Sequence, residues 1–85
     1  MKRTVTRVID GDTFEVNRRI GNSNRVRLAG VNAPEPYQFG AQQATNRLRQ
    51  LIAGETVTII PRGISYNRIV ADVRVNRISV NKRLR

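Results

Sequence analysis

Hydrophobic and polar residues alternate along much of the chain with the period of a β-strand. The clearest case is residues 68–75, where alternate positions hold Ile, Ala, Val and Val. β-branched residues and shorter alternations also mark residues 4–9, 13–17, 25–31 and 56–60, although the alternation in 4–9 is imperfect. The pattern therefore predicts five strands.

The period changes to that of a helix over residues 40–53. Five apolar residues fall on one helical stripe: Ala41, Ala44, Leu48, Leu51 and Ile52. Gly54 stands where a helix commonly ends in the left-handed conformation. One helix is therefore predicted between the third and fourth strands.

Turn-forming residues separate these elements. Asp10-Gly11-Asp12 predicts a tight hairpin turn in which Gly11 supplies a positive φ. Residues 61–67 are expected to form a loop and residues 76–77 a turn, and residues 78–80 a short strand. Asn81 is a candidate cap for a final helical turn.

The predicted element order is β-β-β-α-β-β, in a single domain spanning residues 1–85. This order is typical of the five-stranded Greek-key barrel of the OB-fold, in which a helix closes one end of the barrel. An SH3-like barrel would lack the helix, and a ferredoxin-like fold would need a helix after the first strand. A mainly β OB-fold is therefore the predicted fold class.

Composition restricts the chemistry. The chain of 85 residues carries 16 Lys and Arg against 6 Asp and Glu, a formal net charge of +10, and it has neither His nor Cys. Catalysis by imidazole or thiol is excluded, as are disulfides and Cys or His metal sites. The positive charge suits an anionic polymer such as DNA or RNA, although a merely solvated basic surface would also fit it. An anionic membrane is not expected as a partner, because no basic helix has a bulky apolar face. No apolar run is long enough to span a membrane.

Two of the six acids are candidates for a shared site. Asp12 opens the second predicted strand and Glu35 follows the third, so both side chains can lie at the same rim of a barrel. A pair of converging carboxylates would suit a hard divalent cation. Asp10 is expected to form the turn. Spacing alone does not single out Arg27 or Arg68 from the other arginines.

Two segments taken together resemble the thermonuclease family of staphylococcal-nuclease-like domains. They are Val8-Ile9-Asp10-Gly11-Asp12-Thr13-Phe14 and Val26-Arg27-Leu28-Ala29-Gly30-Val31-Asn32-Ala33-Pro34-Glu35. The helix spacing, Tyr66-Asn67-Arg68 before a strand, and Val80-Asn81 follow in the same order. The resemblance implies a Ca²⁺-dependent phosphodiesterase acting on DNA and RNA.

The same resemblance implies roles for individual residues. Asp12, Asn32 and the main-chain carbonyl of Ala33 match the metal ligands. Glu35 matches the glutamate that activates or orients the attacking water, and Arg27 and Arg68 match two phosphate-binding arginines. Tyr66 matches a tyrosine near the substrate phosphate. Asp10 belongs to the turn motif and matches a residue that contacts the metal ligands without binding the metal itself.

Three departures from the family pattern change these expectations. Asn32 stands where the family usually has Asp, so Ca²⁺ binding is expected to be weak. Asn67 replaces the usual Gly, a mild change because Asn tolerates positive φ. Family members continue beyond the position of Arg85 with helices that pack on the barrel, and barrel surface left exposed would favour a homodimer or strand exchange.

Three functions remain open on sequence alone. The first is the nuclease, and the second is a catalytically weakened module that binds nucleic acid through phosphate contacts. The third is a protein-interaction domain. Few aromatic residues are available to stack on bases, and Phe14 and Phe39 are both expected in the core. The sequence assigns no compartment, since cytoplasmic and secreted mature forms both fit it.

Overall fold

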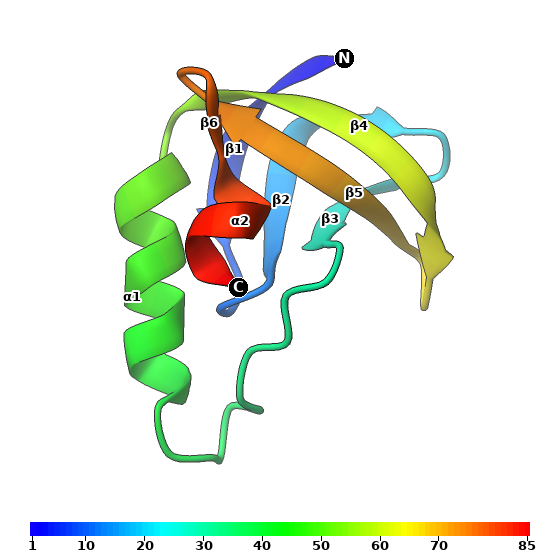
Figure 1. Ribbon diagram of the computed structural model, residues 1–85. Coiled ribbons are helices and arrows are strands. Elements are labelled where there is room, and N and C mark those ends of the chain that lie inside the picture. The colour runs from blue at the N-terminus through cyan, green and yellow to red at the C-terminus, as the bar shows by residue number, and fades with distance from the viewer.

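The computed structural model describes residues 1–85 and shows a small β-barrel with one long helix at its side (Figure 1). The elements are β1 (Lys2–Val8), β2 (Thr13–Ile20), β3 (Ser23–Leu28), α1 (Ala41–Ile52), β4 (Thr56–Ser65), β5 (Arg68–Val75), β6 (Ile78–Ser79) and α2 (Val80–Leu84). The predicted order is confirmed, with a short second helix added at the end. No helix has the length and apolar character needed to cross a membrane.

Strand pairing closes the sheet into a barrel. Neighbouring strands follow the order β3-β2-β1-β4-β5-β6, and β3 also pairs with β5. The β3–β5 pairing is parallel and sets Arg27 opposite Val70, whereas every other pairing is antiparallel. The five-stranded barrel expected from the sequence is therefore present, with β6 added at its edge.

The apolar faces of the strands and of α1 meet in one core of 17 buried residues, so the chain has a single hydrophobic centre. Ile69, Ala71, Val73 and Val75 of β5 all belong to it, as the alternation predicts. In β1 the buried residues Val5 and Val8 are three positions apart, because the pairing register with β2 shifts between Val5 and Arg7. This bulge explains the imperfect alternation of the first strand.

The prediction of a loop over residues 61–67 is wrong for most of its length, because β4 continues to Ser65. Pro61 lies opposite Ala71, and the register shifts between Pro61 and Gly63. A bulge is one of the few places where a sheet accommodates proline, which has no N–H to donate. Only Tyr66 and Asn67 form the turn, both with positive φ.

Three smaller expectations are also corrected. β3 ends at Leu28 rather than at residue 31, since Leu28 N–H already bonds the Asp12 carbonyl across the rim. Phe39 is 98% exposed instead of buried, because it lies in the irregular segment before α1. The cap of α2 is Ser79, whose hydroxyl accepts from the Lys82 N–H.

Candidate functional site

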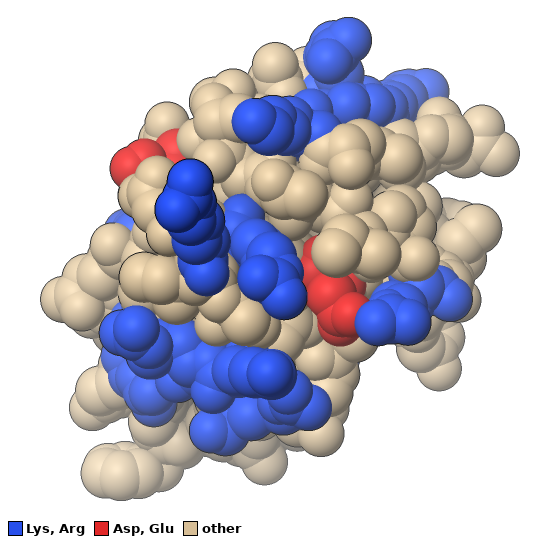
Figure 2. All heavy atoms as spheres, turned by 45° about the horizontal axis from the view of Figure 1, so that its top comes forward, with Lys and Arg blue, Asp and Glu red and all other residues tan.

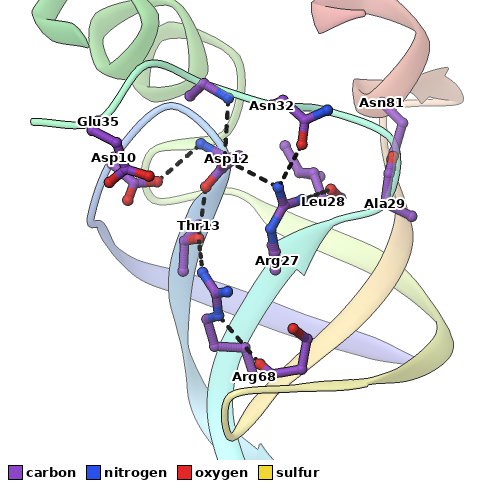
Figure 3. A network of polar contacts seen from close by, with 12 residues as sticks. Asp10, Asp12, Thr13, Arg27, Leu28, Ala29, Asn32, Glu35, Arg68 and Asn81 are labelled. Atoms are coloured by element: carbon purple, nitrogen blue, oxygen red, sulfur yellow. Dashed lines mark hydrogen bonds and ion pairs between the residues drawn. The ribbon is translucent and has the colours of Figure 1, made fainter. Parts of the chain in front are cut away.

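The centre of the candidate site is Asp12, at the point where the β1–β2 connection enters β2. Its side chain is largely buried and accepts hydrogen bonds on both oxygens: Thr13 Oγ donates to Oδ1 at 2.9 Å and Ala33 N–H to Oδ2 at 3.1 Å. Arg27 forms an ion pair with Oδ2 at 3.4 Å. Asp12 therefore joins β2, β3 and the segment that follows β3 (Figure 3).

Asp10 shapes the connection that holds Asp12. Its Oδ1 accepts from the Asp12 N–H at 3.0 Å, so the side chain forms the turn expected of it. Burial raises the pKa of Asp10, and the neighbouring Asp12 carboxyl raises it further. Burial also acts to raise the pKa of Asp12, but hydrogen bonds from Asp10, Ala33 and Thr13 and the charge of Arg27 bring it below its usual value. The two carboxyl groups thus differ in acidity because their donors differ.

Gly11 is required for a different reason than the one the sequence suggests. It is not among the positive-φ residues. A Cβ at this position would lie 2.6 Å from the Cβ of Ala44 and 2.7 Å from that of Ala33. The absence of a side chain therefore lets α1 and the segment after β3 approach the Asp10–Asp12 connection closely.

Arg27, on β3, is held at several points. Its Nη1 donates to the Leu28 carbonyl at 2.6 Å, and its Nη2 donates to the Asn32 amide oxygen at 2.9 Å. Only about 20% of its side chain is exposed. These contacts fix the guanidinium at the rim beside Asp12 with N–H groups to spare, since a guanidinium has five.

Arg68 approaches the same rim from the start of β5. Its Nη1 lies 3.4 Å from the Thr13 hydroxyl oxygen, and its Nε donates to the Ser65 carbonyl. Tyr66 is 90% exposed, and its ring lies 5.9 Å from the Arg68 guanidinium carbon. Thr13 therefore links Asp12 to Arg68, while Tyr66 stands at the outer side of that arginine.

Glu35 lies in the exposed segment between β3 and α1. Its backbone is held by Gln38, whose side chain accepts from the Glu35 N–H at 2.8 Å. The side chain is exposed, and its carboxylate has no hydrogen bond or ion pair; Figure 3 shows it in the segment that follows β3. The structure thus brings Asp12, Arg27 and Arg68 into one chain of contacts, and Glu35, with its free carboxylate, does not join it.

A hollow of about 350 Å³ opens next to Asp10, between the segment after β3 and the start of α1. Its lining is mostly polar and includes Gln38, Gln42 and Arg49. This hollow therefore gives solvent access to Asp10 from the side of α1.

The candidate metal ligands fit a hard divalent cation in their chemistry, because all of them offer oxygen. Their arrangement is less complete. No three acids lie together in a position to hold a metal ion. The amide oxygen of Asn32 accepts from Arg27. Of the three expected ligands, only Asp12 is charged, because Asn32 offers an amide oxygen and Ala33 a main-chain carbonyl.

Asn81 is a structural residue that sequence reasoning placed wrongly. It is 3% exposed and lies within α2, where its amide accepts from Val73 N–H and donates to the carbonyls of Ala29 and Ala71. It thereby fastens the chain leaving β3 to β5, just before Asn32. A lone Asn near the end of the chain gives no periodic signal that would reveal this.

The fold is a mainly β barrel of the OB type in which Arg27 and, through Thr13, Arg68 are linked to Asp12 at one rim, and sequence comparison gives its family. Residues 25–84 match the staphylococcal nuclease homologue family, so the chain belongs to that family.

Relatives with curated names agree with this. An "Uncharacterized endonuclease" of Escherichia coli is 42% identical over 72 residues, covering 81% of this chain and 45% of the relative. A "Probable endonuclease LCL3" of Komagataella phaffii is 40% identical over 76 residues, covering 78% of this chain and 33% of the relative. An "Uncharacterized endonuclease" of Haemophilus influenzae is 31% identical over 78 residues, covering 91% of this chain and 44% of the relative. The chain spans less than half the length of these relatives.

Proposed function

We propose that this chain is an endonuclease domain that hydrolyses phosphodiester bonds of DNA or RNA by attack of water. The observation that carries the proposal is a chain of polar contacts at the barrel rim. Arg27 pairs with Asp12, Asp12 accepts from Thr13, and Thr13 accepts from Arg68, so two guanidiniums lie at the same rim. Family membership and the names of the relatives support the same reaction.

In this proposal the arginines stabilise the charge that builds on the phosphate oxygens. Arg27 is anchored by Leu28 and Asn32 before any substrate arrives, so little reorganisation is needed during the reaction. Arg68 keeps its Nη2 free of protein partners, and Tyr66 offers an exposed ring and hydroxyl beside the phosphate.

Glu35 is the base in this proposal. Its carboxylate has no protein donor, so it is available to orient a water molecule and accept its proton. The water oxygen then bonds to phosphorus, the bond to the leaving oxygen breaks, and that oxygen takes up a proton from solvent to leave as an alcohol. Ca²⁺ at Asp12, Asn32 and the Ala33 carbonyl would neutralise phosphate charge when bound.

A nuclease assay on single-stranded DNA and on RNA, with Ca²⁺ or with EDTA, tests the proposal. Glu35→Gln and Arg27→Lys should each lower the cleavage rate about 100-fold or more. The matched controls Glu55→Gln and Arg18→Lys change surface groups away from the rim and should leave the rate nearly unchanged. Equal rates in all four variants, or no cleavage under any condition, would remove the hydrolytic role.

Binding without cleavage would instead favour the second candidate, a module that holds nucleic acid. The observation behind it is Asn32, which supplies no charge and bonds Arg27. In that case Arg27→Lys would weaken binding while Glu35→Gln would leave it unchanged or strengthen it, since Glu35 repels phosphate.

A further inference from the structure

A second group of cations lies at the opposite end of β5 from Arg68. Lys2 on β1 pairs with Thr58 on β4, and Thr58 pairs with Arg74 on β5. Side chains directly opposite one another across strands share one face of a sheet. Because Val57, Ile59, Val73 and Val75 point into the core, this row of three lies on the outer face of the barrel.

The β5–β6 turn completes the group. Asn76 and Arg77 have φ values of 48° and 69°, and together with the row they line a hollow of about 420 Å³. Its lining consists of Lys2, Thr56, Thr58, Arg74, Asn76 and Arg77, and contains no acid and no apolar residue. We call these six residues the distal basic hollow. Figure 2 shows the side of the molecule that comes forward from the top of Figure 1, where Lys and Arg greatly outnumber acids.

The lack of compensating charge distinguishes this hollow from other cross-strand rows. In the row Arg7–Glu15–Arg25, an acid sits between two arginines and pairs with both, at 3.7 and 3.2 Å. Arg62 is likewise paired with Asp72. In the distal row the central position is Thr58, and none of the three cations of the hollow, Lys2, Arg74 and Arg77, has an ion pair.

Three unpaired cations around one hollow repel one another, and an anion placed among them relieves that repulsion. Thr and Asn side chains add neutral hydrogen-bond donors suited to phosphate oxygens. A membrane surface fits less well, since the lining offers no apolar side chain for insertion.

We infer that the distal basic hollow is a second binding site for the phosphate backbone of a nucleic acid, separate from the rim that carries Asp12. Arg68 and Arg74 are six residues apart on β5, which corresponds to about 20 Å along a strand. A long nucleic acid can therefore contact both places, whereas an oligonucleotide of a few residues at the rim cannot reach the hollow.

The test is binding of labelled single-stranded DNA of 24 and of 4 nucleotides, measured by fluorescence anisotropy in EDTA. The variant Lys2→Gln/Arg74→Gln/Arg77→Gln is compared with Arg18→Gln/Lys82→Gln/Arg83→Gln. Both triple variants remove one Lys and two Arg that form no ion pair, so their net charge is the same. Because EDTA prevents metal-dependent cleavage, this proposal and the proposed hydrolysis can fail independently.

For the 24-nucleotide probe, the distal variant should bind about tenfold more weakly than the control variant, and the salt slope should fall by about two. For the 4-nucleotide probe, the two variants should bind alike. Equal losses in both variants would show a general charge effect, and an equal loss with both probes would place these cations in the rim site. Either result overturns the inference, as does tighter binding to vesicles of anionic lipid than to the long probe.

A single substitution provides a check that does not remove any cation. Thr58→Glu places an acid between Lys2 and Arg74 and reproduces the arrangement of Arg7, Glu15 and Arg25. It should leave the thermal midpoint unchanged or raised while weakening binding of the long probe. Undiminished binding by a folded Thr58→Glu protein would contradict the inference even if the triple variant failed to fold.

Discussion

The hydroxyl of Thr13 donates a hydrogen bond to Oδ1 of Asp12 at 2.9 Å, and its own oxygen, Thr13 Oγ1, lies 3.4 Å from Nη1 of Arg68. One buried hydroxyl thus orients a carboxylate from the β1–β2 connection and an arginine from the start of β5. Thr13 was not singled out by sequence reasoning, because its role depends on the contact between β2 and the start of β5.

Thr13→Val should lower the cleavage rate about tenfold, since Asp12 loses a donor and Nη1 of Arg68 loses its acceptor. Valine keeps the shape of threonine, so the change in thermal midpoint should be small in comparison. Thr6→Val, on the exposed side of β1, is the control. Initial rates on single-stranded DNA provide the measurement, and a Thr13→Val protein with the parent's rate would show that the hydroxyl has no part in positioning Arg68.

Gly11→Ala should destabilise the fold by about 1–3 kcal/mol, because the added Cβ meets Ala44 and Ala33 at distances that require a shift of the backbone. Gly63→Ala is the control, since nothing lies within 4 Å of a Cβ there. Urea unfolding of both variants measures the difference. Equal stabilities would mean that α1 moves away from the β1–β2 connection without cost.

Asn81→Ala should lower the free energy of unfolding by at least about 2 kcal/mol, because Val73 N–H and the Ala29 carbonyl lose a buried partner. Asn24→Ala removes an exposed amide and should change stability little. Chemical denaturation again gives the comparison. A loss no greater than that of the control would show that water replaces the Asn81 amide.

Asn32→Asp should tighten Ca²⁺ binding about tenfold, because affinity for this cation rises with the charge of its ligands. The new carboxylate also faces Arg27, which keeps it ionised. Asn46→Asp on α1 adds the same charge away from the rim and serves as the control. Isothermal titration calorimetry measures the affinities. If both variants bind Ca²⁺ like the parent, position 32 is not a ligand.

Tyr66→Ala should raise KM severalfold with little change in kcat, whereas Tyr66→Phe should resemble the parent if the ring is what contacts the substrate. The ring is exposed and stands over Arg68, so it can stack on a base while the arginine holds the phosphate. Steady-state kinetics on a short oligonucleotide separates the two constants. A fall in kcat alone would place Tyr66 in the chemical step.

The sequence predicts the elements whose periodicity is strong. β5 buries the residues its alternation indicates. Of the stripe predicted for α1, Leu48 and Ile52 are buried and the other three residues are partly buried, and Gly54 ends the helix with a φ of 72°. The extension of β4 past Pro61 was missed, because the local signal for a break is the same whether a proline ends a strand or sits at a bulge. Pairing with β5 decides between the two.

Contacts between distant segments explain what the sequence could not reveal at the site. The approach of Ala33 and Arg27 to Asp12 follows from two hairpins meeting at one rim, which the element order suggests. The links through Thr13 and Asn81 depend on side-chain directions that no spacing encodes. Phe39 was misplaced because an aromatic residue outside a regular element has no periodic face to predict its burial.

The parallel pairing of β3 with β5 has a consequence for the folding of the chain. Arg27 and Arg68 belong to these two strands, which α1 and β4 separate along the chain. Such contacts between remote parts of a chain form slowly. We therefore expect the β3–β5 pairing, and with it the arrangement of the two guanidiniums, to form late in folding. A chain cleaved before β5 would lack Arg68 and so could not form the pair.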